Sequence, residues 1–290
     1  MSYDGAPPAT LENGPRVWQG SMKKREIGVC LFFAGSFIIL FLNLWGRNLE
    51  NHDYLRYAEV AKEMIQSGDW IVPRFNGEIF LHKPPFLFWL IALPSTIHGS
   101  VSPFLARLPS AFFAWLGAIT VYLWGRKIWS GRRWGMVSAG ILISSYLYFW
   151  QGRIARTDMV FSVLILLSLY FFHESYSVED PSLSTLFSFL FMALAGLTKG
   201  PVGILFPLLI MFLFLLRRSQ LKYFIRKDSI FGYFVAAVIP GVWVVLFLHQ
   251  MGWEEALMAW QESEILSRQA PFYLYLTRVW VDFAPWSIFL

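Results

Sequence analysis

Long apolar runs alternate with short polar segments along most of the chain. A helix needs about 20 mostly apolar residues to cross the bilayer, because each residue advances it by only about 1.5 Å. Seven runs approach this length: 27–45, 104–124, 134–150, 159–176, 183–198, 202–216 and 230–248. An eighth begins near Arg278 and is cut short at Leu290. The pattern predicts an all-α integral membrane protein, a multi-pass helical bundle of about seven complete spans and a partial eighth.

The short basic clusters predict the orientation of this bundle. Lys and Arg gather at 23–25, 126–133 and 217–227, and the positive-inside rule places such clusters in the cytoplasm. An even number of spans must then separate consecutive clusters. The apolar segment 84–99 is short and contains Pro94, so we interpret it as a re-entrant or interfacial helix. It lies within one long external loop, 46–103, which is expected to carry amphipathic interfacial helices.

Composition supports a membrane protein and narrows the function classes. The chain is 56% hydrophobic and 15% charged with a mean hydropathy of +0.50, whereas soluble domains carry about 25% charged residues. The net charge of +5 resides in the loop clusters, so no nucleic-acid partner is expected. The single Cys30 excludes a disulfide framework and a thiolate metal site.

Two parts are expected along the chain. Residues 1–22 are polar and rich in Pro and Gly, which predicts a disordered cytoplasmic tail. Residues 23–290 form one transmembrane domain, and the uncapped apolar stretch 283–290 at its end predicts that this domain is incomplete at the C-terminus.

Basic residues also occur on the predicted external side, where the positive-inside rule disfavours them. They are Arg56, Arg74, Lys83, Arg153, Arg156, Lys199 and Arg268. Positive charge in this position suggests that it is kept there to bind an anion.

The first candidate site segment is 51–65. Its apolar positions form a helical stripe that suits a helix on the membrane surface, with Glu59 on the other face. Asp53 stands at the start of this helix, and Arg56, three residues on, shares its face. The alternative is that Asp53 only caps the helix.

Two lysines are candidates for phosphate binding. Lys83 precedes Pro84-Pro85, which fix an extended chain, and Lys199 is the one charge between two apolar runs, next to Gly200. A charge at the membrane edge is a functional candidate. The alternative is that both lysines merely extend their ammonium groups toward the interface.

A third candidate segment combines Arg153, Arg156 and Asp158 directly before the run 159–176. An acid at a helix N-terminus is favoured by the helix dipole, so capping is again the alternative. The two arginines in a short external loop argue against that account.

Together these segments resemble the GT-C glycosyltransferase superfamily of bacterial aminoarabinose (lipid A) transferases and protein O-mannosyltransferases. The matching stretches are HDYLRYAEVAKEMIQSGDWIVPRFNGEIFLHKPPFLFWL, ARLPSA, GRIARTDM, LTKGPVGILFP and PFYLYLTRVWVDFAPWS, in this order between residues 51 and 290. Each stretch alone is a weak signal, but five in order are specific for the superfamily. Members of the family are longer, with further membrane helices and often an external C-terminal domain.

The resemblance implies an enzyme of the bacterial cytoplasmic (inner) membrane, with its active site on the extracytoplasmic face. It would transfer a sugar from a polyprenyl-phosphate carrier to a hydroxyl or phosphate acceptor on lipid A, another glycan or a protein. Membrane lipids would surround it. The family's catalytic carboxylate corresponds to Asp53, and the second external acid corresponds to Asp158.

The resemblance also assigns binding residues. Lys83 and Lys199 correspond to the family's lysines before Pro-Pro and Gly-Pro, and they would hold the carrier phosphate. Arg56 and Arg156 complete the predicted phosphate-binding set. Tyr57 and Glu59 are predicted to line the substrate site.

The chain departs from the family pattern at two positions. Tyr54 replaces a second acid, and His82 replaces a Glu before Lys83. Some members bind a divalent metal through that Glu and a later His, but residues 263–268 contain no His. The resemblance leaves a divalent metal open, the residues argue against it, and no other cofactor is expected.

Two other function classes fit the same residues. A flippase or transporter of polyprenyl-phosphate sugars would also need cations at the membrane edge, but it predicts inverted repeats, which we do not detect. A membrane assembly subunit would use its acids only as caps, with Asp53 and Asp158 far apart.

Overall fold

The computed structural model describes the backbone of residues 16–46, 52–177, 180–262 and 273–289. Within these ranges, the side chains of 16–25, 52–53, 260–262 and 273–277 are outside the description.

The described chain is a bundle of apolar helices, as predicted. Its main helices are α1 (Arg16–Phe41), α4 (Pro103–Ile128), α5 (Arg132–Ser144), α7 (Thr157–Ser177), α8 (Ser182–Lys199), α9 (Val202–Arg217) and α10 (Lys227–Met251). Of the described helices, α4, α7, α8 and α10 are long and apolar enough to cross a membrane, and α9 is a shorter apolar helix. The protein is therefore a multi-pass membrane helical bundle.

The predicted single span 134–150 is wrong, because the chain is broken at Ser145. This residue is extended, with φ −70° and ψ 129°, and separates α5 from α6 (Tyr146–Gln151). The Ser145 hydroxyl donates to the carbonyl of Ile141 at 2.7 Å, and the amide of Tyr146 donates to Ala284 at 2.8 Å. At this break the Ser145 hydroxyl bonds back to the last turn of α5, and the Tyr146 amide takes a partner outside the helix.

Both ends of the described chain also differ from the prediction. Helix α1 already begins at Arg16, inside the segment predicted to be a tail. Helix α12 (Tyr273–Asp282) is under way before Arg278 and ends at Asp282, and a short 3-10 helix, η3 (Trp286–Phe289), follows it. The predicted disorder of the tail is otherwise not tested, since residues 1–15 lie outside the described part. The predicted incompleteness at the C-terminus stays a prediction.

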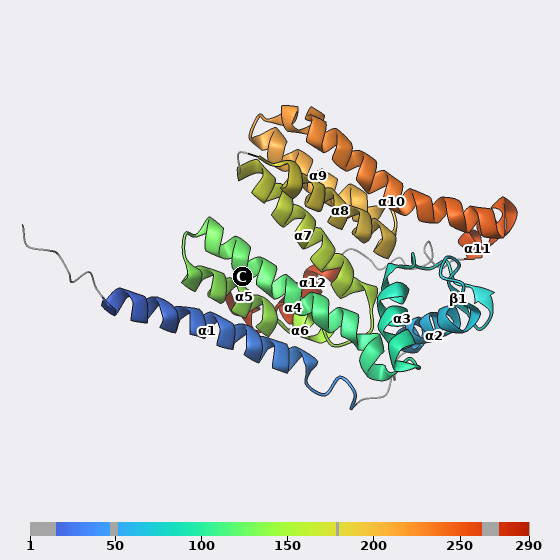
Figure 1. Ribbon diagram of the computed structural model, residues 1–290, viewed down its shortest axis with the longest axis horizontal. Helices are drawn as coiled ribbons and strands as arrows, with labels where there is room; N and C mark the ends of the chain where they lie inside the picture. Colours follow the sequence, from blue (N-terminus) through green and yellow to red (C-terminus); the bar gives the residue numbers. More distant parts are fainter. Residues whose placement is uncertain (1–15, 47–51, 178–179, 263–272, 290) are drawn as a thin grey trace, which may run out of the picture.

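The helices pack in two groups that α7 joins. Helices α8, α9 and α10 gather on one side of α7, whereas α4, α5 and α1 lie on the other (Figure 1). Helices α7 and α8 are antiparallel neighbours, and the Ser188 hydroxyl of α8 donates to the carbonyl of Ser168 in α7 at 2.8 Å. This arrangement brings the start of α7 next to the end of α8.

The predicted external loop forms a compact cap at one end of the bundle. It contains α2 (His52–Ser67), a hairpin of β1 (Arg74–Phe75) and β2 (Glu78–Ile79), and α3 (Phe86–His98). The hairpin turn uses Asn76 and Gly77, both with positive φ, which is the favoured sequence for such a turn. The amides of both turn residues donate to the Glu63 carboxylate of α2.

Helix α3 is too short to span the membrane. Its 13 residues give a length of about 20 Å, against a hydrocarbon core of about 30 Å. It packs against α2 and α4, in agreement with the re-entrant or interfacial interpretation. The apolar face of α2 is buried against the protein, with Val60 and Ala61 fully covered. The helix that was predicted to lie on the membrane surface therefore packs its apolar face on α3.

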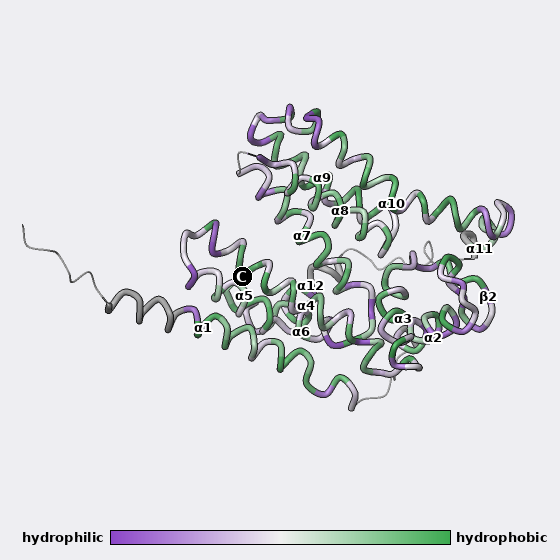
Figure 2. The backbone as a smooth tube through the Cα atoms, viewed as in Figure 1, coloured by the Kyte–Doolittle hydropathy of each residue, from purple (hydrophilic) through white to green (hydrophobic). Residues whose placement is uncertain are grey.

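The two ends of the bundle differ in sequence. Hydrophilic positions gather at the helix ends and over the cap, and apolar ones fill the helix middles (Figure 2). The α4–α5 and α9–α10 connections, which carry the basic clusters, lie together at the end away from α2 and α3 (Figure 1). The cap and the starts of α4 and α7 form the other end.

Candidate functional site

A charged cluster forms where the start of α7 meets the end of α8. Asp158 is the second residue of α7 and Lys199 is the last residue of α8. The Lys199 ammonium lies 2.5 Å from one Asp158 oxygen, and the Arg156 Nε lies 3.1 Å from the other. Three residues that the sequence predicted separately are thus in direct contact.

A tight turn holds Lys199 in this position. Gly200 has φ +76° and ψ −153°, a conformation that is essentially restricted to glycine, and its amide donates to Gly196 at 2.7 Å. At Gly203 a Cβ would overlap the backbone carbonyl of Ala195, so α9 can approach α8 this closely only without a side chain there. The ammonium also lies 4.7 Å from the ring centre of Phe161, a cation–π distance.

The loop before α7 is held in place by α4. The Ser110 hydroxyl of α4 donates to the carbonyl of Arg156 at 3.3 Å. Ala155 and Thr157 on either side of Arg156 are buried. The loop therefore holds the Arg156 backbone rigidly while its guanidinium reaches Asp158.

Lys83 contributes a third cation. It stands half-buried in the turn before α3, whose first helical residues follow Pro85, and its charge acts on the Asp158 carboxylate. Lys83, Arg156 and Lys199 thus place three positive charges around the Asp158 carboxylate. The Asp158, Lys199 and Arg156 side chains are 31%, 25% and 34% exposed, so a ligand can reach the cluster.

This arrangement determines what the cluster can do chemically. One Asp158 oxygen accepts a hydrogen bond from Lys199, and the other forms an ion pair with Arg156, which favours the charged carboxylate and makes it a poor proton acceptor. Its geometry suits the task of holding Lys199 and Arg156 in place. The clustered cations can bind an anion such as a phosphate through charge-assisted hydrogen bonds.

The other predicted site residues belong to α2. The predicted catalytic residue Asp53 is the second residue of this helix, and its side chain lies outside the described part. The Arg56 guanidinium lies 5.7 Å from the ring of Phe75 and 5.8 Å from that of Phe80. These rings hold Arg56 over the hairpin.

Tyr57 and Glu59 are placed differently from one another. Tyr57 is buried and packs against the rings of Phe80 and Phe88. Glu59 forms an ion pair with Lys62 at 2.7 Å on the exposed face of α2. Glu59 thus points to the surface of the cap, and Tyr57 supports the fold of the cap from within.

Buried apolar packing joins α2 to the charged cluster. Tyr57 of α2, Phe88 of α3, and Met159 and Ala195 of α7 and α8 belong to one continuous hydrophobic cluster. Tyr57 follows Asp53 by four residues, and Met159 is next to Asp158. The start of α2 therefore lies at the same end of the bundle as Asp158 and Lys199.

Two arginines have structural roles that sequence reasoning did not predict. Arg107 is 6% exposed and donates to the carbonyl of Leu44 at 2.6 Å. Arg153 donates to the carbonyls of Ile39 and Leu42 at 2.9 and 2.6 Å, so it caps the end of α1. An arginine within an apolar run is unusual, so the stretch ARLPSA could have indicated a special role for Arg107. The partners of Arg153 are distant in sequence and become visible only in the fold.

The described part of the chain contains no ligand set for a metal ion. His82 packs against the ring of Phe80, with 4.9 Å between the ring centres. Among the described residues, no group of three or more His, Cys, Asp or Glu side chains is placed to hold a metal ion. Residues 263–268 lie outside the described part.

The chain is similar to known proteins over most of its length. Residues 29–284 match the family model described as dolichyl-phosphate-mannose-protein mannosyltransferase. An uncharacterized protein of Aquifex aeolicus is 30% identical over 80% of this chain and 46% of its own length. The undecaprenyl phosphate-alpha-4-amino-4-deoxy-L-arabinose arabinosyl transferase of Yersinia enterocolitica is 28% identical over 89% of this chain and 47% of its own length.

Solved structures agree with these sequence relatives. The crystal structure of ArnT from Cupriavidus metallidurans in the apo state has a TM-score of 0.83 and 25% identity, and the match covers 92% of this chain and 50% of that one. The structure of the same protein bound to undecaprenyl phosphate has a TM-score of 0.81 over 90% of this chain and 49% of that one. The chain spans about half the length of the relatives it matches. With its fold, its motifs and the family match in agreement, the chain belongs to the dolichyl-phosphate-mannose-protein mannosyltransferase family of GT-C glycosyltransferases.

Proposed function

We propose that this chain is the catalytic membrane part of a glycosyltransferase that takes a sugar from a polyprenyl-phosphate carrier. The acceptor is a hydroxyl or phosphate group on lipid A, another glycan or a protein. The proposal places the enzyme in the bacterial cytoplasmic (inner) membrane, with the cap and the charged cluster on the extracytoplasmic face. The basic α4–α5 and α9–α10 connections then face the cytoplasm, in line with the positive-inside rule.

The observation that carries the proposal is the cluster of cations around Asp158. Lys199 and Arg156 contact its two oxygens, and Lys83 adds a third cation. This cluster lies at the membrane edge, at the ends of two apolar helices, where a lipid-linked phosphate arrives with its chain in the bilayer. A solved relative of similar fold contains undecaprenyl phosphate, which supports the same class of donor.

The reaction follows from the roles of these residues. The acceptor hydroxyl attacks the anomeric carbon of the sugar, and Asp53 takes its proton as general base. The bond between that carbon and the carrier phosphate oxygen breaks, and the polyprenyl phosphate leaves with the electron pair. One displacement inverts the anomeric configuration.

The cations act on the leaving group. Lys83, Lys199 and Arg156 stabilise the negative charge that grows on the phosphate, as preorganised donors do in a partly dry site. Arg56 lies on the same helix as Asp53 and supports the phosphate or the acid from the cap side. Asp158 holds Lys199 and Arg156 in place throughout, and Tyr57 and Glu59 shape the cap.

The alternative functions predict other observations. A flippase needs two related halves around a central pathway, and an assembly subunit needs no cluster of cations. The family match and the cation cluster favour a transferase over both.

A transfer assay tests the proposal. Membranes that contain the protein are supplied with radiolabelled sugars on polyprenyl phosphate, and incorporation into lipid and protein is measured for wild type and Asp53→Asn. Loss of a general base typically lowers the rate about 10²–10⁴-fold, so incorporation should nearly vanish in the variant. Lys62→Met, on the exposed face of α2, is the matched control and should keep wild-type incorporation. Incorporation indifferent to Asp53 would overturn the mechanism.

A further inference from the structure

The end of the bundle opposite the charged cluster has its own concentration of basic residues. The connection from α9 to α10 contains the 3-10 helix η1 (Leu221–Ile225). Five basic residues occupy this connection and its flanks: Arg217, Arg218, Lys222, Arg226 and Lys227. One acid, Asp228, lies among them and pairs with Arg226 at 3.1 Å.

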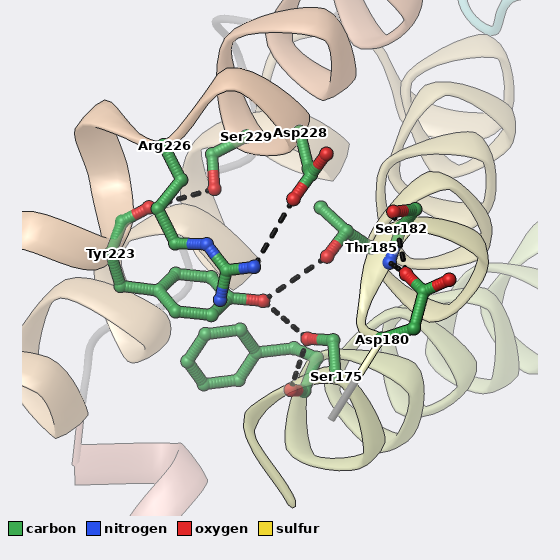
Figure 3. A network of polar contacts seen from close by, with 9 residues as sticks. Ser175, Asp180, Ser182, Thr185, Tyr223, Arg226, Asp228 and Ser229 are labelled. Carbon is green, nitrogen blue, oxygen red and sulfur yellow. Dashed lines mark hydrogen bonds and ion pairs between the residues drawn. The ribbon is translucent and has the colours of Figure 1, made fainter. Parts of the chain in front are cut away.

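A polar network fixes the shape of this connection. The Tyr223 hydroxyl contacts the hydroxyls of Ser175 in α7 and Thr185 in α8 (Figure 3). The Ser229 hydroxyl donates to the Tyr223 carbonyl at 2.8 Å, and the Arg226 guanidinium lies 5.2 Å from the Tyr223 ring. Since η1 is tied to three helices, the basic side chains around it project from a rigid base.

Apolar side chains are exposed at the same level. Ile225 is 73% exposed and Leu221 is 40% exposed. Residues three apart share an edge of a 3-10 helix, so Lys222 and Ile225 lie one above the other. An ammonium beside an exposed aliphatic side chain matches the boundary between lipid headgroups and acyl chains.

The other basic connection at this end has two of its four basic residues paired with acids. Lys127 pairs with Glu174 at 2.8 Å, and Arg132 pairs with Glu26 at 3.5 Å. In the described part of the chain, the ion pairs include none with Arg217, Arg218, Lys222 or Lys227. The two connections therefore differ in free positive charge although both are basic.

We propose that the η1 connection is a binding site for the headgroup of an anionic phospholipid. Arg217, Arg218, Lys222 and Lys227 supply the charge for the phosphate, and Ile225 and Leu221 enter the edge of the acyl region. Clusters of this size beside a membrane helix attract acidic lipids. The site is separate from the carrier-phosphate site at the other end of the bundle, and its existence does not depend on the transfer reaction.

Fluorescence quenching in reconstituted bilayers tests the site. Cys30, the sole cysteine of the chain, is replaced by Ser, and Gln220→Cys next to η1 carries a fluorophore. The bilayers are phosphatidylcholine with the same small fraction of quencher-labelled phosphatidylglycerol or quencher-labelled phosphatidylcholine. We expect the anionic quencher to be enriched at least about fivefold at the fluorophore, and salt to reduce this enrichment.

Two sets of variants distinguish a local site from the overall charge. Replacement of Arg217, Arg218 and Lys222 by Gln should remove the enrichment. Replacement of Arg126 and Arg133, two exposed residues of the α4–α5 connection, should leave it intact. Circular dichroism of each variant checks that the helices are retained.

Several results would overturn the proposal. Equal quenching by the two lipids in wild type would exclude an anionic headgroup site, as would enrichment that survives the triple replacement or high salt. Equal loss in the control variant would reduce the effect to net charge. Competition by dissolved inorganic phosphate at millimolar concentration would show a site for free phosphate in place of a lipid.

Discussion

The two ends of this bundle use similar residues with opposite results. At the Asp158 end, the cations Lys83, Arg156 and Lys199 gather around one carboxylate in a partly exposed cluster. At the Tyr223 end, hydroxyls from three elements contact one another, and Arg226 is matched by Asp228 (Figure 3). The first cluster presents its cations to a ligand, whereas the Tyr223 network is a structural joint that holds the basic η1 connection in place.

The largest effect on stability is expected at Gly203, which allows α8 and α9 to meet behind Lys199. Gly203→Ala places a Cβ on the carbonyl of Ala195, and overpacking of this kind costs about 3 kcal/mol. Thermal unfolding in detergent should show the loss, together with reduced sugar transfer. Gly241→Ala in α10 is the control, because its Cβ meets no atom within 4 Å. Similar unfolding temperatures for the two variants would disprove the close-packed turn.

A smaller loss is expected at the ion pairs themselves. Asp158→Asn leaves Lys199 and Arg156 without their carboxylate, and because the groups are partly exposed we expect about 2 kcal/mol. Sugar transfer should fall as well, since the two cations lose their common anchor. Unfolding measurements and transfer assays on the same preparation test both effects. Full activity at reduced stability would show that Asp158 is structural only.

Loss of the Tyr223 hydroxyl should lower stability and leave activity unchanged. Tyr223→Phe removes the hydroxyl that contacts Ser175 and Thr185, at a cost of about 1 kcal/mol. Transfer activity should stay at the wild-type level, because this network lies at the end of the bundle away from Asp158. Reduced transfer by a variant that unfolds like wild type would show that the two ends are coupled.

The smallest effect is expected at Asp180, an exposed acid before α8. Hydrogen bonds from the hydroxyl and the amide of Ser182 lower the pKa of this carboxyl from its ordinary value of 3.8. A lowered folded-state pKa means that the carboxylate stabilises the fold above pH 3.8 and that this contribution is lost as the pH falls further. Acid unfolding curves of wild type and Asp180→Asn should therefore converge at low pH. Curves that differ equally at all pH values would contradict this role.

The sequence predicted the elements that depend on hydropathy. Apolar runs and basic clusters were sufficient to predict the helical bundle and the shortness of α3, because hydropathy along the chain follows from composition. The break at Ser145 was missed, since its cause is a hydrogen bond from Tyr146 to the distant Ala284. The hairpin was also missed, although Asn76-Gly77 between short β-type segments is a recognisable turn signal.

The candidate site was predicted only as separate residues. Lys83, Arg156, Asp158 and Lys199 stood out because charges are rare beside apolar runs. The pairing of Asp158 with Lys199 could not be predicted, because it depends on how α7 and α8 pack over 41 residues of separation. Phe161 shares a helix face with Asp158. This spacing indicates that the two side chains are close to each other, but it does not indicate that the Phe161 ring contacts the Lys199 ammonium.

Binding of undecaprenyl phosphate tests the central claim, that the cations around Asp158 hold the carrier phosphate. Radiolabelled lipid is titrated against purified wild type, Lys199→Met and the surface control Lys62→Met. Loss of one charge-assisted hydrogen bond weakens binding by at least about tenfold, so Lys199→Met should bind correspondingly less tightly while Lys62→Met binds like wild type. Equal affinity of all three proteins would contradict the account and place the phosphate elsewhere in the molecule.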